Sequence, residues 1–141
     1  MKRLAFDTNV ILYALADFRD SHKTQIARGI LDSIDTTQPL PLLSTRVLNE
    51  FSSVVTRRSS ISQADLQMTM RLLLRMEIVQ VSESIIVAAI DRTYSDRLNF
   101  YDALIVEAAL TGGADILYAE DLSHGQRFGQ LRVVNPFLPK T

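Results

Sequence analysis

The sequence of 141 residues contains no cysteine and only two histidines, His22 and His124. Without cysteine the chain cannot form disulfides, zinc–thiolate sites, iron–sulfur clusters or thiol nucleophiles. Two histidines also argue against a multi-histidine metal site, and we expect both of them at the surface. Metal or catalytic chemistry, if present, therefore depends on oxygen ligands.

The chain has little net charge and no long hydrophobic run. Its 15 basic and 16 acidic residues give a net charge of −1, so binding to a polyanion would require a local basic patch. No apolar run approaches the roughly 20 residues that span a bilayer, and Asp7 interrupts the first segment before a signal peptide could form. We therefore expect a cytoplasmic protein with a single domain over residues 1–141.

Short apolar, strand-like segments alternate with helix-like segments along the chain. The expected strands cover residues 3–6, 42–43, 78–81, 116–118 and 131–134. The expected helices cover residues 10–16, 21–34, 45–55, 63–76, 83–94 and 102–110. Ser62 and Asp65 fit a capping box for the helix over 63–76. One buried face is expected on the helix over 45–55, made of Val47, Leu48, Phe51, Val54 and Val55. Strands that alternate with helices pair in parallel through right-handed crossovers. The order predicts an α/β fold, a three-layer α/β/α sandwich with a central, mainly parallel sheet.

Four acidic residues fall near the expected carboxyl ends of strands, where ligands bind in such sheets. Asp7 follows the first strand, and Glu50 lies in the helix after the second. Asp102 opens the helix before the fourth strand, and Asp121 follows that strand. Each acid alone has an ordinary explanation as a turn, capping or solvated residue. Together they predict a site whose carboxylates repel one another unless a cation neutralises their charge.

The expected cation is Mg²⁺ or Mn²⁺, because carboxylates are the ligands that these hard ions prefer. Such an ion can activate a water molecule, orient an in-line attack and stabilise the leaving oxygen in phosphodiester cleavage. This chemistry needs neither histidine nor cysteine, in agreement with the composition.

Four segments resemble the motifs of PIN-domain ribonucleases, and more narrowly those of VapC-type toxins from bacterial toxin–antitoxin pairs. They are residues 6–12 (FDTNVIL), 49–51 (NEF), 99–105 (NFYDALI) and 117–122 (LYAEDL). The resemblance implies a PIN-like α/β/α domain that cleaves RNA with Mg²⁺ or Mn²⁺. It also implies a homodimer and a cognate antitoxin as partners. We expect no organic cofactor and no membrane attachment.

The resemblance also implies roles for individual residues. Asp7, Glu50 and Asp102 would be the central metal-binding and catalytic acids, Asp121 the fourth acid and Asn9 a supporting polar residue. One departure is Ala119, which stands where the family often has threonine or serine.

RNA-binding residues are harder to predict from this sequence. The candidate phosphate contacts are arginines, namely Arg57, Arg58, Arg71, Arg75, Arg92 and Arg97. The alternative is a solvated helix face, or for Arg57 and Arg58 an interaction with a helix dipole. Met68, Leu72 and Met76 form an apolar stripe at helical spacing, for which we expect core packing. The alternative is a dimer or antitoxin surface.

Two other protein classes with acids at strand ends fit this sequence less well. A phosphoacceptor receiver domain needs a late lysine, and none occurs between Lys23 and Lys140. A haloacid-dehalogenase-like phosphatase needs a second aspartate where Asn9 stands. A non-catalytic PIN-like scaffold that binds RNA or protein stays open, as does a housekeeping RNA-processing PIN nuclease.

Overall fold

One mixed sheet organises the computed structural model, which describes residues 2–16, 21–34, 39–58 and 61–139. The strands within these ranges are β1 (Leu4–Phe6), β2 (Leu42–Ser44), β3 (Glu77–Val79), β4 (Ile116–Tyr118), β5 (Arg127–Phe128) and β6 (Leu131–Val134). The helices are α1 (Thr8–Leu15), α2 (Ser21–Asp32), α3 (Thr45–Arg58), α4 (Gln63–Leu73), α5 (Glu83–Asp96) and α6 (Phe100–Thr111).

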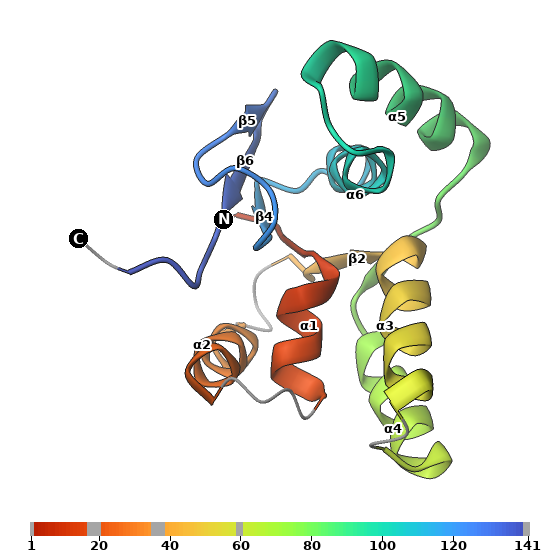
Figure 1. Ribbon diagram of the computed structural model, residues 1–141, viewed down its shortest axis with the longest axis vertical. Helices are drawn as coiled ribbons and strands as arrows, with labels where there is room; N and C mark the ends of the chain where they lie inside the picture. The colour runs from red at the N-terminus through yellow and green to blue at the C-terminus, as the bar shows by residue number, and fades with distance from the viewer. Residues whose placement is uncertain (1, 17–20, 35–38, 59–60, 140–141) are drawn as a thin grey trace.

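The strand order is β3-β2-β1-β4-β6-β5, and every pairing is parallel except that of β5 with β6. In Figure 1, α1 and α2 lie below the strands, α3 and α4 lie at the lower right, and α5 and α6 lie at the upper right beside β4 and β6. This arrangement confirms the predicted three-layer sandwich. Phe6 at the end of β1 pairs with Tyr118 at the end of β4. The two central strands therefore end at the same edge, which is where the chain continues into Asp7 and Asp121.

The core lies between the sheet and its helices. On α3 the predicted apolar face is confirmed, because Val47, Phe51 and Val55 are buried. They belong to the same core cluster as buried sheet residues such as Leu43 and Leu117. Full burial of side chains of this size stabilises the fold by roughly 1.5–3 kcal/mol each. This packing holds the beginning of α3 close to the end of β2.

Local capping signals account for two helix starts. Ser62 accepts a hydrogen bond from the Asp65 amide at 3.1 Å and caps α4, as predicted. Ser44 caps α3 by accepting a hydrogen bond from the Val47 amide at 3.1 Å.

Two elements differ from what the sequence indicated. β5 was not predicted, because a two-residue strand has no periodic pattern and exists only through its antiparallel pairing with β6. The helix expected to reach residue 76 ends at Leu73, and β3 starts at Glu77.

The expected core packing of the methionine-containing stripe on α4 was also wrong. Met68 is 65% exposed and Leu72 is 51% exposed, whereas only Met76, beyond the helix, packs partly against the core. The helix directs Leu73 inward instead, at 1% exposure. Since Leu73 lies about 100° around the helix from Leu72, burying one exposes the other. Within the described ranges, no helix has both the length and the apolar character needed to cross a membrane.

Candidate active site

Asp7 occupies the junction between β1 and α1. Its side chain is 6% exposed and caps α1, where a carboxylate oxygen accepts a 2.6 Å hydrogen bond from the Thr8 amide. Its own amide donates to the Tyr118 carbonyl at 2.9 Å and continues the β1–β4 pairing. The carboxylate is therefore held at the shared edge of the two central strands.

The other three predicted acids act electrostatically on Asp7. The pKa of Asp7 is raised from its ordinary 3.8 to about 7; burial is the largest cause, and the hydrogen bond from Thr8 opposes the rise. The negative charges of Asp102, Glu50 and Asp121 add to it, in that order. The fold thus gathers carboxylates from three other segments around one buried acid.

Asp102 lies in the first turn of α6, after the cap formed by Asn99. Partial burial raises the pKa of Asp102 most, followed by the charges of Asp121 and Glu50. The positive charge of Arg46 lowers it. Asp102 and Asp7 are therefore the two acids whose ionised forms the site disfavours most clearly.

Asn9 and Asp121 contact each other directly. The Asn9 side-chain amide donates to an Asp121 carboxylate oxygen at 3.1 Å, which links the first turn of α1 to the loop after β4. Ala119 is fully buried. At this point the chain has no hydroxyl, and Asn9 is the side chain that orients Asp121.

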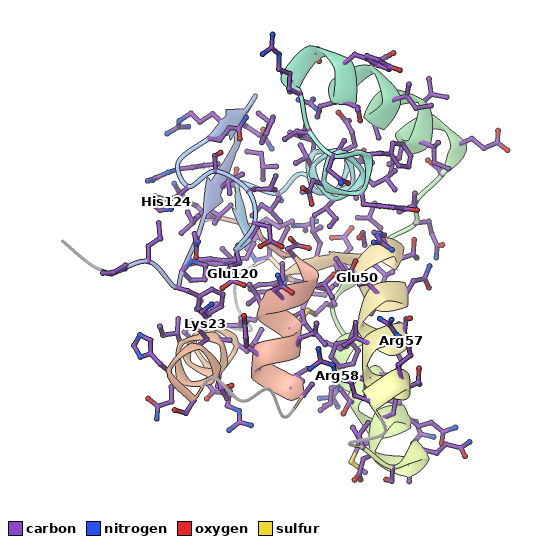
Figure 2. The ribbon with its side chains drawn as sticks, in the orientation of Figure 1. Lys23, Glu50, Arg57, Arg58, Glu120 and His124 are labelled. Atoms are coloured by element: carbon purple, nitrogen blue, oxygen red, sulfur yellow. The ribbon has the colours of Figure 1, made fainter. Side chains whose placement is uncertain are left out.

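The neighbouring Glu120 serves a different cluster. It accepts hydrogen bonds from Lys23 at 2.5 Å and from the Tyr13 hydroxyl at 3.0 Å. Figure 2 shows Glu120 and Lys23 beside α1 and α2, whereas Glu50 lies across on α3. Glu120 therefore ties α1 and α2 to the loop after β4, and Asp121 is the acid that joins the site.

Arg46 is a site residue that sequence reasoning missed. It lies one turn before Glu50 on α3, and its guanidinium donates to a Glu50 carboxylate oxygen at 2.6 Å. The guanidinium carbon also lies 4.2 Å from the centre of the Tyr101 ring on α6. The i,i+4 spacing of Arg46 and Glu50 was a usable signal for the ion pair. No sequence pattern indicated the contact with Tyr101.

The predicted RNA-contacting arginines lie outside this cluster of contacts. Arg57 and Arg58 are exposed in the last turn of α3, further along the helix that carries Glu50 (Figure 2). Arg71 and Arg75 are exposed on and just after α4. All four are accessible to a ligand.

Arg92, by contrast, is a structural residue. It pairs with Asp96 at 2.7 Å and with Glu107, and it lies over the ring of Phe128. It joins α5, α6 and β5, so its guanidinium is held by the fold. Arg97 caps α5 in the left-handed conformation, with φ at 56°. His22 and His124 are exposed, as expected.

The donor set of this edge suits a hard divalent cation, because it consists of carboxylates. No group of three or more His, Cys, Asp or Glu side chains in the described part of the chain is already arranged to hold an ion. One reason lies in Glu50, whose carboxylate is bound to Arg46. The buried Asp7 carboxylate nevertheless has a neighbourhood whose negative charge a cation would relieve.

Comparison with known protein families decides the classification. The model of the PIN domain matches residues 4–126. The chain belongs to the PIN-domain family. The predicted family is thereby confirmed, and the matched range includes all four acids of the site.

Solved structures extend the agreement in fold over nearly the whole PIN chain. A toxin–antitoxin complex from Klebsiella pneumoniae superposes with a TM-score of 0.70 at 21% identity, covering 95% of this chain and 98% of that one. VapC20 from Mycobacterium tuberculosis, described as a sarcin–ricin loop cleaving toxin, gives a TM-score of 0.66 at 22% identity over 84% and 89%. VapBC2 from Rickettsia felis, bound to a promoter DNA fragment, gives 0.64 at 21% over 92% and 96%. No curated protein matches the sequence.

Proposed function

We propose that this PIN-domain protein is a Mg²⁺- or Mn²⁺-dependent endoribonuclease and the toxin of a type II toxin–antitoxin pair. The observation that carries the proposal is the buried Asp7 carboxylate, with three further carboxylates close enough to raise its pKa. Such a site is costly for the fold, and a divalent cation would offset that cost.

In this proposal Asp7, Glu50 and Asp102 hold one ion, and Asp121 helps to hold it or a second ion. A bound ion would supply charge neutralisation and a water molecule that loses its proton more easily than bulk water. The backbone around β1 and the Thr8 amide fix Asp7 in place. Asn9 keeps Asp121 oriented toward the site through its 3.1 Å hydrogen bond.

The exposed arginines of α3 and α4 are proposed to contact RNA phosphates. Arg57 and Arg58 follow Glu50 along α3, so a strand cleaved at the acids can continue past them (Figure 2). Arg71 and Arg75 give α4 further positive charge. Contacts of this kind position the backbone without reading its sequence.

The assignment as a toxin is supported by the proteins that share this fold. The Klebsiella pneumoniae structure is a toxin–antitoxin complex, and VapC20 is described as a toxin that cleaves the sarcin–ricin loop. We therefore propose a cognate antitoxin and a second copy of the chain as partners, with activity in the cytoplasm. The exposed Met68 and Leu72 give α4 an apolar surface of the kind that protein partners cover.

The test is cleavage of total cellular RNA by the purified, antitoxin-free protein in Mg²⁺ or Mn²⁺, with EDTA as the metal-free condition. Discrete fragments should form only with metal, and Asp102→Asn should abolish them. The matched control is Asp91→Asn, which removes one exposed carboxylate from α5 and should leave cleavage unchanged.

Substantial cleavage by Asp102→Asn would contradict the assignment of the acids. Failure of the folded wild-type protein to cleave under either metal would favour a PIN-like scaffold that binds RNA or protein. A housekeeping role would be indicated if the fragments were processing intermediates of stable RNA and if expression did not arrest growth.

A further inference from the structure

Arg46 and Tyr101 form a pair at the rim of the acidic site. Arg46 precedes Glu50 by one turn of α3, and Tyr101 directly precedes Asp102 in α6. The 4.2 Å between the guanidinium carbon and the ring centre places this pair between the two helices that carry two of the proposed catalytic acids. A ligand entering the site from this side meets both side chains.

Tyr101 presents an accessible aromatic surface there. Its side chain is 53% exposed although it is large and mostly apolar. Arg46 lies over the ring, and Phe100 contacts it in an edge-on geometry with centroids 5.7 Å apart. These contacts restrain the ring while much of it stays open to solvent. A restrained, exposed ring is suited to stacking, because little entropy is lost when a second flat group packs on it.

Arg46 is incompletely satisfied in its present position. Its one carboxylate partner is Glu50, and its Nε atom is buried without a hydrogen-bond partner among the described residues. Arg92 shows the contrast, since two carboxylates bind it. A guanidinium has five N–H donors, and the geometry of two of them matches two oxygens of a phosphate. The buried Nε atom is out of a ligand's reach, but the Arg46 side chain is 25% exposed, so its terminal nitrogens keep N–H donors that Glu50 does not use.

The negative charge of the site makes a positively charged side chain at this position favourable for binding a phosphodiester. Four carboxylates repel a phosphodiester, and Arg46 is positive where its charge also acts on Asp102. Stacking on Tyr101 requires a base that is free of its partner strand. A single-stranded nucleotide offers both groups at once, a phosphate for Arg46 and a flat base for Tyr101.

We propose that Arg46 and Tyr101 form a nucleotide subsite that holds single-stranded RNA against the acidic cluster, with Arg46 on a phosphate and Tyr101 stacked on a base. The inference rests on the proposed ribonuclease function and names two side chains that position the RNA. It assigns substrate binding to two residues beside the acids, separate from the metal-holding role of those acids.

The test measures binding of a fluorescently labelled, randomised single-stranded RNA of about 12 nucleotides. Fluorescence anisotropy reports the binding, and EDTA is present so that the RNA is not cleaved. Tyr101→Leu keeps an apolar side chain but removes the aromatic face, and it should weaken binding about tenfold. Tyr101→Phe retains the face and should bind within about twofold of wild type. The control Tyr94→Leu removes an 84% exposed tyrosine from α5 and should have no effect.

The role of Arg46 is read from the salt dependence of the same binding. Arg46→Gln should lower the slope of log affinity against log salt concentration by about 0.7, the value for one phosphate contact on single strands. Arg46→Lys should keep most of that slope, because it keeps the charge. Arg132→Gln, an equal charge change at an exposed position on β6, should not alter the slope.

Several outcomes would overturn the subsite. They are wild-type affinity in Tyr101→Leu, an unchanged slope in Arg46→Gln, or an equal loss of affinity on duplex RNA. Absence of any RNA binding by the wild type would also overturn it. Failure of the proposed nuclease function is distinguishable from failure of the subsite. In that case the wild-type protein still binds RNA through Tyr101 but does not cleave it with Mn²⁺.

Discussion

Replacing Asp7 by asparagine should make the metal-free protein more stable above neutral pH. Asparagine has nearly the same shape, and its side-chain oxygen can still accept the 2.6 Å hydrogen bond from the Thr8 amide. The substitution therefore preserves the cap of α1 and removes only the buried negative charge.

The size of the effect follows from the pKa of Asp7, which is about 7 in the folded protein against an ordinary 3.8. Because the folded pKa is the higher one, the folded state keeps a proton that the unfolded state loses between these values. Stability conferred by that proton is complete below about pH 4 and is lost as the pH rises to about 7. At about 1.4 kcal/mol per pH unit, the ionised wild type pays about 4 kcal/mol that Asp7→Asn does not.

The measurement is urea denaturation followed by circular dichroism between about pH 4 and pH 8 in EDTA. The free energies of unfolding of wild type and Asp7→Asn should lie within about 1 kcal/mol of each other near pH 4 and diverge as the pH rises. Asp91→Asn, which neutralises an exposed aspartate on α5, should track wild type throughout.

Equal or lower stability of Asp7→Asn at about pH 8 would refute the reasoning, because no penalty for burying the charge would then exist. Adding Mn²⁺ provides a second comparison. Bound Mn²⁺ should stabilise the wild type by mass action and should not stabilise Asp7→Asn. The metal should therefore narrow the difference between their free energies of unfolding.

Three further variants test the fold and the site. Gly112→Ala should lower the free energy of unfolding by about 1–3 kcal/mol, since its Cβ would lie 2.5 Å from a Leu42 methyl group. If chemical denaturation shows a smaller decrease in this free energy, the Leu42 side chain moves aside and the prediction is wrong. Gly29→Ala, in open space on α2, should instead raise the melting temperature, by the equivalent of about 0.5–1 kcal/mol. Asn9→Ala removes the hydrogen bond to Asp121 and should slow metal-dependent RNA cleavage by about tenfold or more with an unchanged melting temperature; full activity would exclude a supporting role.

Much of the fold was predictable because its signals are local. The apolar spacing on α3 identified the buried Val47 and Phe51, and a Ser-to-Asp spacing identified the cap of α4. The predicted bounds of the last strand, residues 131–134, agree with those observed for β6, Leu131–Val134. Each signal depends on residues within one or two turns of a helix, or on one strand, and periodicity reports on that range directly.

The acidic residues were also identifiable as candidates, because parallel sheets place the ends of their strands at one edge. Their motifs pointed to the PIN-domain family, and the family match confirmed it. Their electrostatic interaction, however, depends on burial, and burial is a property of the packed fold. The raised pKa of Asp7 arises mostly from desolvation, which no spacing in the sequence measures.

The sequence by itself determined the alternation of strands and helices, the acids at the strand ends and the family. Only the tertiary structure decided which long side chains meet across elements: Arg46 with Tyr101, Arg92 with Glu107, and Asn9 with Asp121. It also decided that Met68 faces solvent. Contacts of this kind require two segments to be placed within a few ångströms of each other. That placement follows from the packing of the whole core and not from any local pattern.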